Sequence, residues 1–106
     1  MEKKVILHID TKDNKKTLIM LEIDGKKSKI SKVTNSWSSQ ILLPMIWNIL
    51  EKNKLSISDI TEIIVDKGPG SFTGLRVGIA VANVLGYLLN IPVNGKKGNI
   101  VEPIYE

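Results

Sequence analysis

The run of residues 66–78 constrains the fold more than any other part of the sequence. It reads DKGPGSFTGLRVG and joins an apolar run at 60–65 to a long apolar stretch of helical character. Three glycines and a proline lie between residues 68 and 74, so the backbone can turn sharply and crowd its N–H groups together. Such a loop at the start of a helix suits an anion, or very close packing of a strand against a helix.

Composition limits the architecture and the chemistry. The chain has 106 residues, 42% of them apolar and 25% charged, which suits one globular domain with a single core. There is no cysteine, which excludes disulfides, thiolate metal sites and cysteine nucleophiles. His8 is the single histidine, so a histidine-pair metal site or a complete Ser-His-Asp triad is disfavoured. We therefore predict no metal site and no catalytic residues.

The net charge of +4 is concentrated in the first third of the chain. Residues 1–35 hold nine lysines and five acids, whereas residues 36–106 hold six basic and six acidic groups. One interpretation is a nucleic-acid footprint, and the other is a solvated edge strand protected against aggregation. No aromatic residue interleaves with these lysines, as single-strand binding would prefer, so the second is favoured. We expect contact with nucleic acid to be weak or indirect.

Residues 77–93 form an uncharged run of seventeen residues. A membrane span needs about 20 apolar residues, and this run contains Asn83, Asn90 and Pro92. We therefore predict a cytoplasmic protein that does not enter a membrane.

The periodicity predicts an α/β fold. The order is three antiparallel strands, a helix, a parallel strand, a helix and a short strand, in one mixed sheet, and the lysine-rich third strand is expected at the sheet edge. This topology matches one half of the actin, Hsp70 and sugar-kinase (ASKHA) fold, which is ribonuclease H-like. Expected strands cover residues 5–9, 17–23, 26–34, 61–66 and 91–93, and expected helices run from 38 or 39 to 53 and from 73 to 89.

Both helices carry more apolar residues than one sheet face can cover. Eight of the ten residues from 41 to 50 are apolar, whereas a surface helix normally shows a single stripe. We interpret the excess as a protein interface that forms a homodimer when the chain is alone. The alternative is that each residue simply fills the core. The predicted interface residues are Leu42, Met45, Ile46, Trp47, Ile49, Leu50, Val81, Val84, Leu85, Tyr87 and Leu88.

The glycine loop fits neither common phosphate motif. The P-loop spacing is absent, and after Gly70 the next glycine comes one position too late for the dinucleotide fingerprint. Ser71 is expected to cap the following helix rather than act as a nucleophile, and Arg76 is expected to have an acidic or phosphate partner. The candidate phosphate or nucleotide contacts are Gly68, Pro69, Gly70, Ser71, Thr73, Gly74 and Arg76.

Two carboxylates end predicted strands near this loop. Asp10 and Asp66 could hold Mg²⁺ through water beside a phosphate, although a carboxylate at a strand end more often caps a turn. ATP with magnesium at a shared interface is therefore an alternative to the prediction of no cofactor.

Residues 68–78 closely resemble the glycine-rich signature of the TsaB (YeaZ) family of bacterial proteins. Residues 6–11, including Ile9-Asp10-Thr11, resemble the opening strand of that family. Residues 42–46 resemble the start of its first helix, and residues 55–60 resemble the turn before its fourth strand. The likeness covers about residues 4–93.

The resemblance implies a non-catalytic subunit in threonylcarbamoylation of adenosine 37 of tRNA. The family pairs with the catalytic paralogue TsaD through two helices, and the ATPase TsaE joins that complex. Residues 1–95 would form the N-terminal ASKHA domain and residues 96–106 a short C-terminal tail, in a minimal form without the family's second domain. The alternatives are a nucleotide-binding protein or enzyme that uses the glycine loop, and a glycoprotease-like peptidase.

Overall fold

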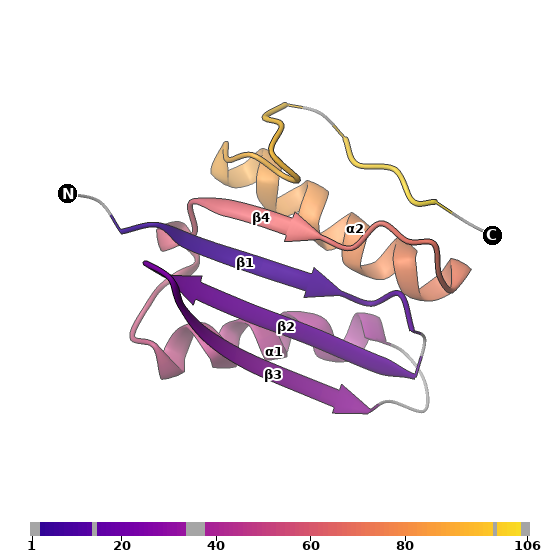
Figure 1. The fold of residues 1–106 in the computed structure, drawn as a ribbon, viewed down its shortest axis with the longest axis horizontal. Coiled ribbons are helices and arrows are strands. Elements are labelled where there is room, and N and C mark those ends of the chain that lie inside the picture. Colours follow the sequence, from indigo (N-terminus) through magenta and orange to yellow (C-terminus); the bar gives the residue numbers. More distant parts are fainter. Residues whose placement is uncertain (1–2, 14, 34–37, 99, 105–106) are drawn as a thin grey trace.

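A single mixed sheet forms one layer of the molecule (Figure 1). The structure, a computed structural model, describes residues 3–13, 15–33, 38–98 and 100–104. The described strands are β1 (Val5–Asp10), β2 (Lys16–Ile23), β3 (Lys26–Val33) and β4 (Glu62–Val65), in the order β3-β2-β1-β4. The first three are antiparallel and β4 runs parallel to β1. The prediction of an ASKHA-type α/β sheet with β3 at the edge is confirmed.

The register follows from a tight hairpin and from alternating burial. Asp24 and Gly25 both have positive φ, 48° and 89°, which is the backbone of a two-residue hairpin turn. In β1, Val5, Leu7 and Ile9 are buried on the face that carries the helices, while the alternate residues point to the other face.

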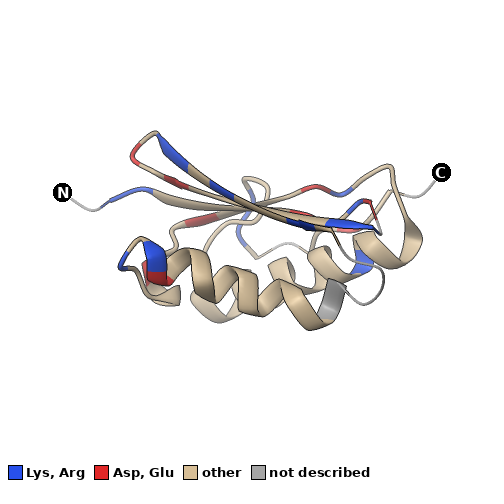
Figure 2. Cartoon of the chain, turned by 90° about the horizontal axis from the view of Figure 1, so that it is seen from below, with Lys and Arg blue, Asp and Glu red and all other residues tan. Residues whose placement is uncertain are grey.

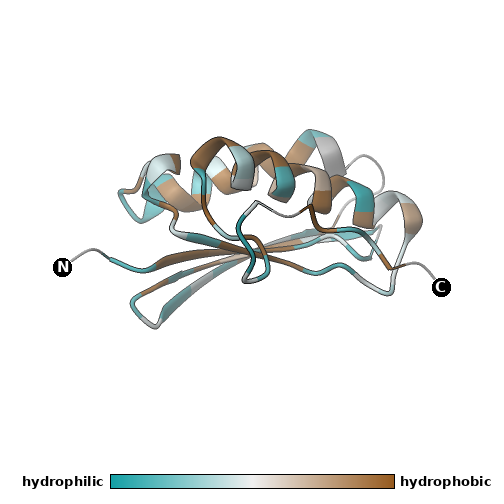
Figure 3. Ribbon diagram, turned by 90° about the horizontal axis from the view of Figure 1, so that it is seen from above, coloured by the Kyte–Doolittle hydropathy of each residue, from teal (hydrophilic) through white to brown (hydrophobic). Residues whose placement is uncertain are grey.

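Two helices pack on the same face of the sheet (Figure 3). They are α1 (Ser38–Lys52) and α2 (Phe72–Leu89), with a short 3₁₀ turn, η1 (Ile57–Asp59), before β4. Pro44 lies inside α1, where it removes one backbone donor, and the helix continues through it. Helix α1 packs against β2 and β3, and α2 against β4 and β1. The two predicted helices are therefore confirmed, each within one residue at the described ends.

Defined caps hold both ends of α2. Ser71 accepts a hydrogen bond from the N–H of Gly74, and Asn90 ends the helix with a left-handed backbone, φ 55°. By length and composition alone α2 could cross a membrane, with a mean hydropathy of 1.5. In this fold seven of its residues are buried, including Leu75, Ile79 and Leu85.

The outer edge of β4 is covered by residues that follow α2. The backbone of Ile63 exchanges hydrogen bonds with Pro92 and Asn94, and the side chain of Asn94 bonds both the N–H and the C=O of Val65, at 2.8 and 3.0 Å. The predicted strand over residues 91–93 is reduced to isolated bridges of Val93, to Ile63 in β4 and to Lys96. Proline has no N–H to donate, and the asparagine side chain replaces the next backbone pair.

Candidate functional site

The glycine loop is packed against protein on both sides. A Cβ atom on Gly70 would lie 2.7 Å from Cβ and 2.8 Å from the carbonyl oxygen of Lys12. Gly68 has φ 104°, and a Cβ there would overlap the carbonyl oxygen of Ile104 in the C-terminal tail. The loop therefore needs glycine because two other segments approach its backbone closely.

Thr11 connects the end of β1 to α2. Its side chain is fully buried, and its hydroxyl donates to the carbonyl of Gly74 at 2.5 Å and accepts from the N–H of Gly78 at 3.0 Å. A Cβ on Gly78 would overlap this hydroxyl oxygen. The contact brings α2 against the first strand with its polar atoms paired, as burial requires.

Several N–H groups of the loop already have acceptors within the protein. Gly68 donates to a carboxylate oxygen of Asp66 at 3.0 Å, Ser71 donates to the carbonyl of Lys12 at 2.8 Å, and Gly74 donates to the hydroxyl of Ser71 at 3.2 Å. Of the two expected uses of the loop, this geometry favours close packing over an anion cradle. Phosphate contact by the loop stays a prediction.

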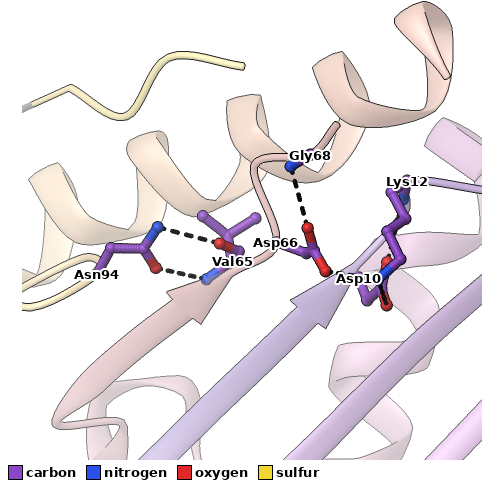
Figure 4. Close-up of polar contacts among 6 residues, drawn as sticks. All are labelled: Asp10, Lys12, Val65, Asp66, Gly68 and Asn94. Carbon is purple, nitrogen blue, oxygen red and sulfur yellow. Dashed lines mark hydrogen bonds and ion pairs between the residues drawn. The ribbon is translucent and has the colours of Figure 1, made fainter. Parts of the chain in front are cut away.

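The two strand-end carboxylates share a lysine (Figure 4). Lys12 Nζ lies 2.9 Å from a carboxylate oxygen of Asp66 and 3.7 Å from one of Asp10. The Lys12 ammonium group thus lies against both carboxylates that the alternative interpretation assigned to a magnesium ion. Within the described ranges, no group of three potential metal ligands comes together.

The same contacts shift the pKa values of this pair. The hydrogen bond to Asp66, with the nearby charge of Asp10, raises the pKa of Lys12. Burial alone would raise the pKa of Asp66, but the hydrogen bonds from Lys12 and from the Gly68 N–H outweigh it, so the pKa is lowered. Both groups are therefore held in their charged forms.

Arg76 lies over an aromatic ring. Its guanidinium carbon is 5.2 Å from the ring centre of Phe72, one turn earlier in α2. Among the residues that the structure describes, no carboxylate forms an ion pair with Arg76. Within this part of the chain the Phe72 ring is the partner seen for Arg76, and the expected acidic or phosphate partner stays a prediction.

The predicted interface residues divide into two groups. Six of them pack inside the core of this chain, which corrects the expectation that they face a partner. The reason is that the sheet covers one side of each helix, and these residues lie on that side. The six are Leu42, Met45, Ile46, Ile49, Leu50 and Leu85. Val81 is half-buried.

The others point outward. Trp47 is 59% exposed, Tyr87 is 85% exposed and Leu88 is 68% exposed, and Val84 is also exposed. Leu43 joins them, although the prediction missed it; its spacing of four residues from Trp47 places both on one helix face. The indole N–H of Trp47 donates to the Glu51 carboxylate at 2.8 Å, which orients the ring along α1. We call Leu43, Trp47, Val84, Tyr87 and Leu88 the outer apolar residues.

Comparison with known proteins agrees with this geometry. Residues 20–95 match the family model described as TsaD: tRNA N6-adenosine threonylcarbamoyltransferase. The chain belongs to this family. The curated relatives that it matches include the tRNA threonylcarbamoyladenosine biosynthesis protein TsaB of Buchnera aphidicola, 39% identical over 84% of this chain, and that of Haemophilus influenzae, 31% identical over 88%. The resemblance to TsaB (YeaZ) is thereby confirmed.

The solved structure of YeaZ from Pseudomonas aeruginosa has the same fold. It superposes with a TM-score of 0.80 at 30% identity, over 85% of this chain and 42% of that one. The chain likewise spans 40% and 39% of the lengths of the two TsaB relatives. The likeness therefore concerns about two fifths of these longer proteins.

Proposed function

We propose that this chain is a non-catalytic subunit that binds TsaD and supports threonylcarbamoylation of adenosine 37 of tRNA, in the cytoplasm. TsaE would join the same complex, and a homodimer would form when TsaD is absent. The names of the curated relatives support a place in this pathway. The observation that carries the binding role is the set of outer apolar residues, which the chain's own core leaves uncovered.

Burying these residues against a partner would supply the binding energy. Each square ångström of apolar surface removed from water contributes about 25 cal/mol. Trp47 and Tyr87 are the natural anchors, because large rigid aromatic residues dominate the energetics of interfaces. Both helices present such residues, so a partner can engage α1 and α2 together.

The surroundings of the candidate nucleophile support a non-catalytic role. The hydroxyl of Ser71 is used as the cap of α2. The ring of His8, on β1, lies 3.5 Å from the Glu22 carboxylate, and residues 8 and 22 point to the sheet face opposite the helices. A nucleophile needs a base within hydrogen-bond reach, and the contacts of the Ser71 hydroxyl in the described structure are Thr73 and the N–H of Gly74. This weakens both the peptidase and the enzyme alternatives.

The deciding experiment is co-expression with TsaD of the same organism, followed by size-exclusion chromatography with light scattering. We expect a one-to-one complex. Replacing Trp47→Ala together with Tyr87→Ala should abolish it, since each anchor is expected to contribute about 2 kcal/mol or more, roughly thirty-fold in affinity. Leu85→Glu is unsuitable because Leu85 is buried and the change would unfold the chain.

The control is Asn48→Ala, an exposed polar position on α1, which should leave the complex intact. Circular dichroism must show that the double variant remains folded. Undiminished pairing of the folded double variant would refute this interface. A magnesium-dependent thermal shift with ATP, given by the chain alone, would instead support the nucleotide-binding alternative.

A further inference from the structure

We propose that the exposed edge of the sheet binds the sugar–phosphate backbone of folded RNA. We call this surface the lysine edge, and it consists of Lys16, Lys26, Lys27, Lys29 and Lys32. The choice of RNA rests on the proposed function, whereas the surface itself consists of strand residues and includes none of the outer apolar residues of α1 and α2. Through the lysine edge the chain would bind tRNA directly, in addition to supporting TsaD.

All five lysines are exposed, and they lie together on the open edge. Strand β3 is outermost in the sheet, and Lys16 begins β2 directly beside Val33, the last residue of β3. Figure 2 shows the basic bands along this side of the sheet, while the helical layer carries few charges. β3 contains no acidic residue at all.

These charges are not neutralised within the fold. Among the described residues, the lysine that forms ion pairs is Lys12, with Asp10 and Asp66. Glu22 is the acid that faces Lys27 across the ladder, and its carboxylate lies 3.5 Å from the His8 ring. The lysine edge therefore keeps an unpaired positive charge available to a polyanion.

The spacing suits a phosphate backbone. Residues 26 and 32 are six positions apart, which is about 20 Å along a strand. A nucleic-acid backbone that runs along an edge of this length brings several phosphates within reach of the lysines. Lys27 and Lys29 point to the open face, and Lys26 and Lys32 to the helix face, so flexible side chains can approach a backbone along the edge from both sides.

Folded RNA fits better than the other polyanions. Single-stranded RNA is normally held by aromatic stacking, and β3 has no aromatic residue. Double-helical RNA is recognised mostly by its shape and by contacts to its phosphates and 2′-hydroxyls, which lysine side chains can make without aromatic stacking. An anionic membrane is usually engaged by a basic amphipathic helix with an apolar face, whereas β3 is a strand composed of lysine and serine apart from Ile30 and Val33.

The test uses the full chain, alone and with TsaD, and an unmodified tRNA transcript labelled for fluorescence anisotropy. Binding is measured from 50 to 300 mM salt for three proteins: the original chain, an edge variant and a control. The edge variant carries Lys16→Gln, Lys26→Gln, Lys27→Gln, Lys29→Gln and Lys32→Gln. The control removes the same charge elsewhere, with Lys52→Gln, Lys54→Gln, Lys67→Gln, Lys96→Gln and Lys97→Gln.

We expect the edge variant to lose at least ten-fold in affinity at low salt. The slope of the logarithm of affinity against the logarithm of salt concentration should also become shallower by roughly three or more. Each phosphate contact that is lost removes about 0.7 to 0.9 from this slope. Equal losses in edge variant and control, or an unchanged edge variant, would overturn the proposal. So would binding to phosphatidylserine vesicles without binding to tRNA. Pairing with TsaD is scored separately on the same proteins, so a failure of either proposal is recognised independently.

Discussion

At the scale of single residues, Thr11 and Gly78 set how closely α2 approaches β1. The hydroxyl of Thr11 is the point at which the strand and the helix meet, and glycine at position 78 leaves room for it. The linear sequence does not predict this contact, because the two residues are 67 positions apart and meet only in the folded chain.

Gly78→Ala should therefore destabilise the protein. Alanine in a helix is ordinarily better than glycine by about 1 kcal/mol, but here the added methyl overlaps the Thr11 hydroxyl, and overpacking costs about 1–3 kcal/mol. Urea unfolding at equilibrium measures the difference. In a Thr11→Ala background the methyl has space, so the double variant should lose less than the sum of the two single changes. Strict additivity would show that the contact does not limit the packing.

Some residue roles were predictable from the sequence and others were not. The cap at Ser71 follows from a hydroxyl placed just before a helix, and the hairpin at Asp24-Gly25 follows from its dipeptide. Lys12 between Asp10 and Asp66 was not predictable, because the acids belong to different strands. The stacking of Arg76 on Phe72 had a local signal, a spacing of four residues on one helix.

At the scale of elements, the sequence predicts where helices and strands lie better than which side of them is buried. Eight of the ten residues from 41 to 50 in α1 are apolar, so the sequence shows little alternation between apolar and polar positions. The buried side and the exposed side of the helix therefore have similar composition. Leu42 and Leu43 are neighbours of the same type, and one is buried while the other is exposed. The residue that faces the sheet is buried, and which residue this is depends on tertiary packing and not on the local sequence.

The C-terminal tail is fixed to α2 by one side chain. Asn83 donates to the carbonyl of Val101 and accepts from its N–H, both at 3.0 Å. Asn83→Ala should speed hydrogen exchange at the Val101 amide and cost about 1–2 kcal/mol for the pair of bonds. Asn48→Ala, on an exposed position of α1, is the control and should change neither quantity. Unaltered exchange at Val101 would mean that other contacts hold the tail.

At the scale of the whole molecule, the exposed apolar surface predicts self-association. We expect a concentration-dependent homodimer of the isolated chain, detected by light scattering at micromolar concentrations, because Tyr87 and Leu88 are costly to leave in water. Tyr87→Lys with Leu88→Lys should give a monomer. Ser31→Lys with Val33→Lys adds the same charge on β3 and should leave the dimer unchanged. A monomeric original chain at high concentration would contradict this expectation.

The segment between Asn94 and Val101 has a consequence for chain length. Asn94 is pinned to β4 and Val101 to α2, while Gly95 and Gly98 between them have open space where a side chain would begin. Both ends of this connection are thus held independently of what joins them. Closing a longer loop costs only about 0.6 kcal/mol for each doubling of its length. An entire additional domain spliced in at this position would therefore leave the sheet, both helices and the seated tail in place.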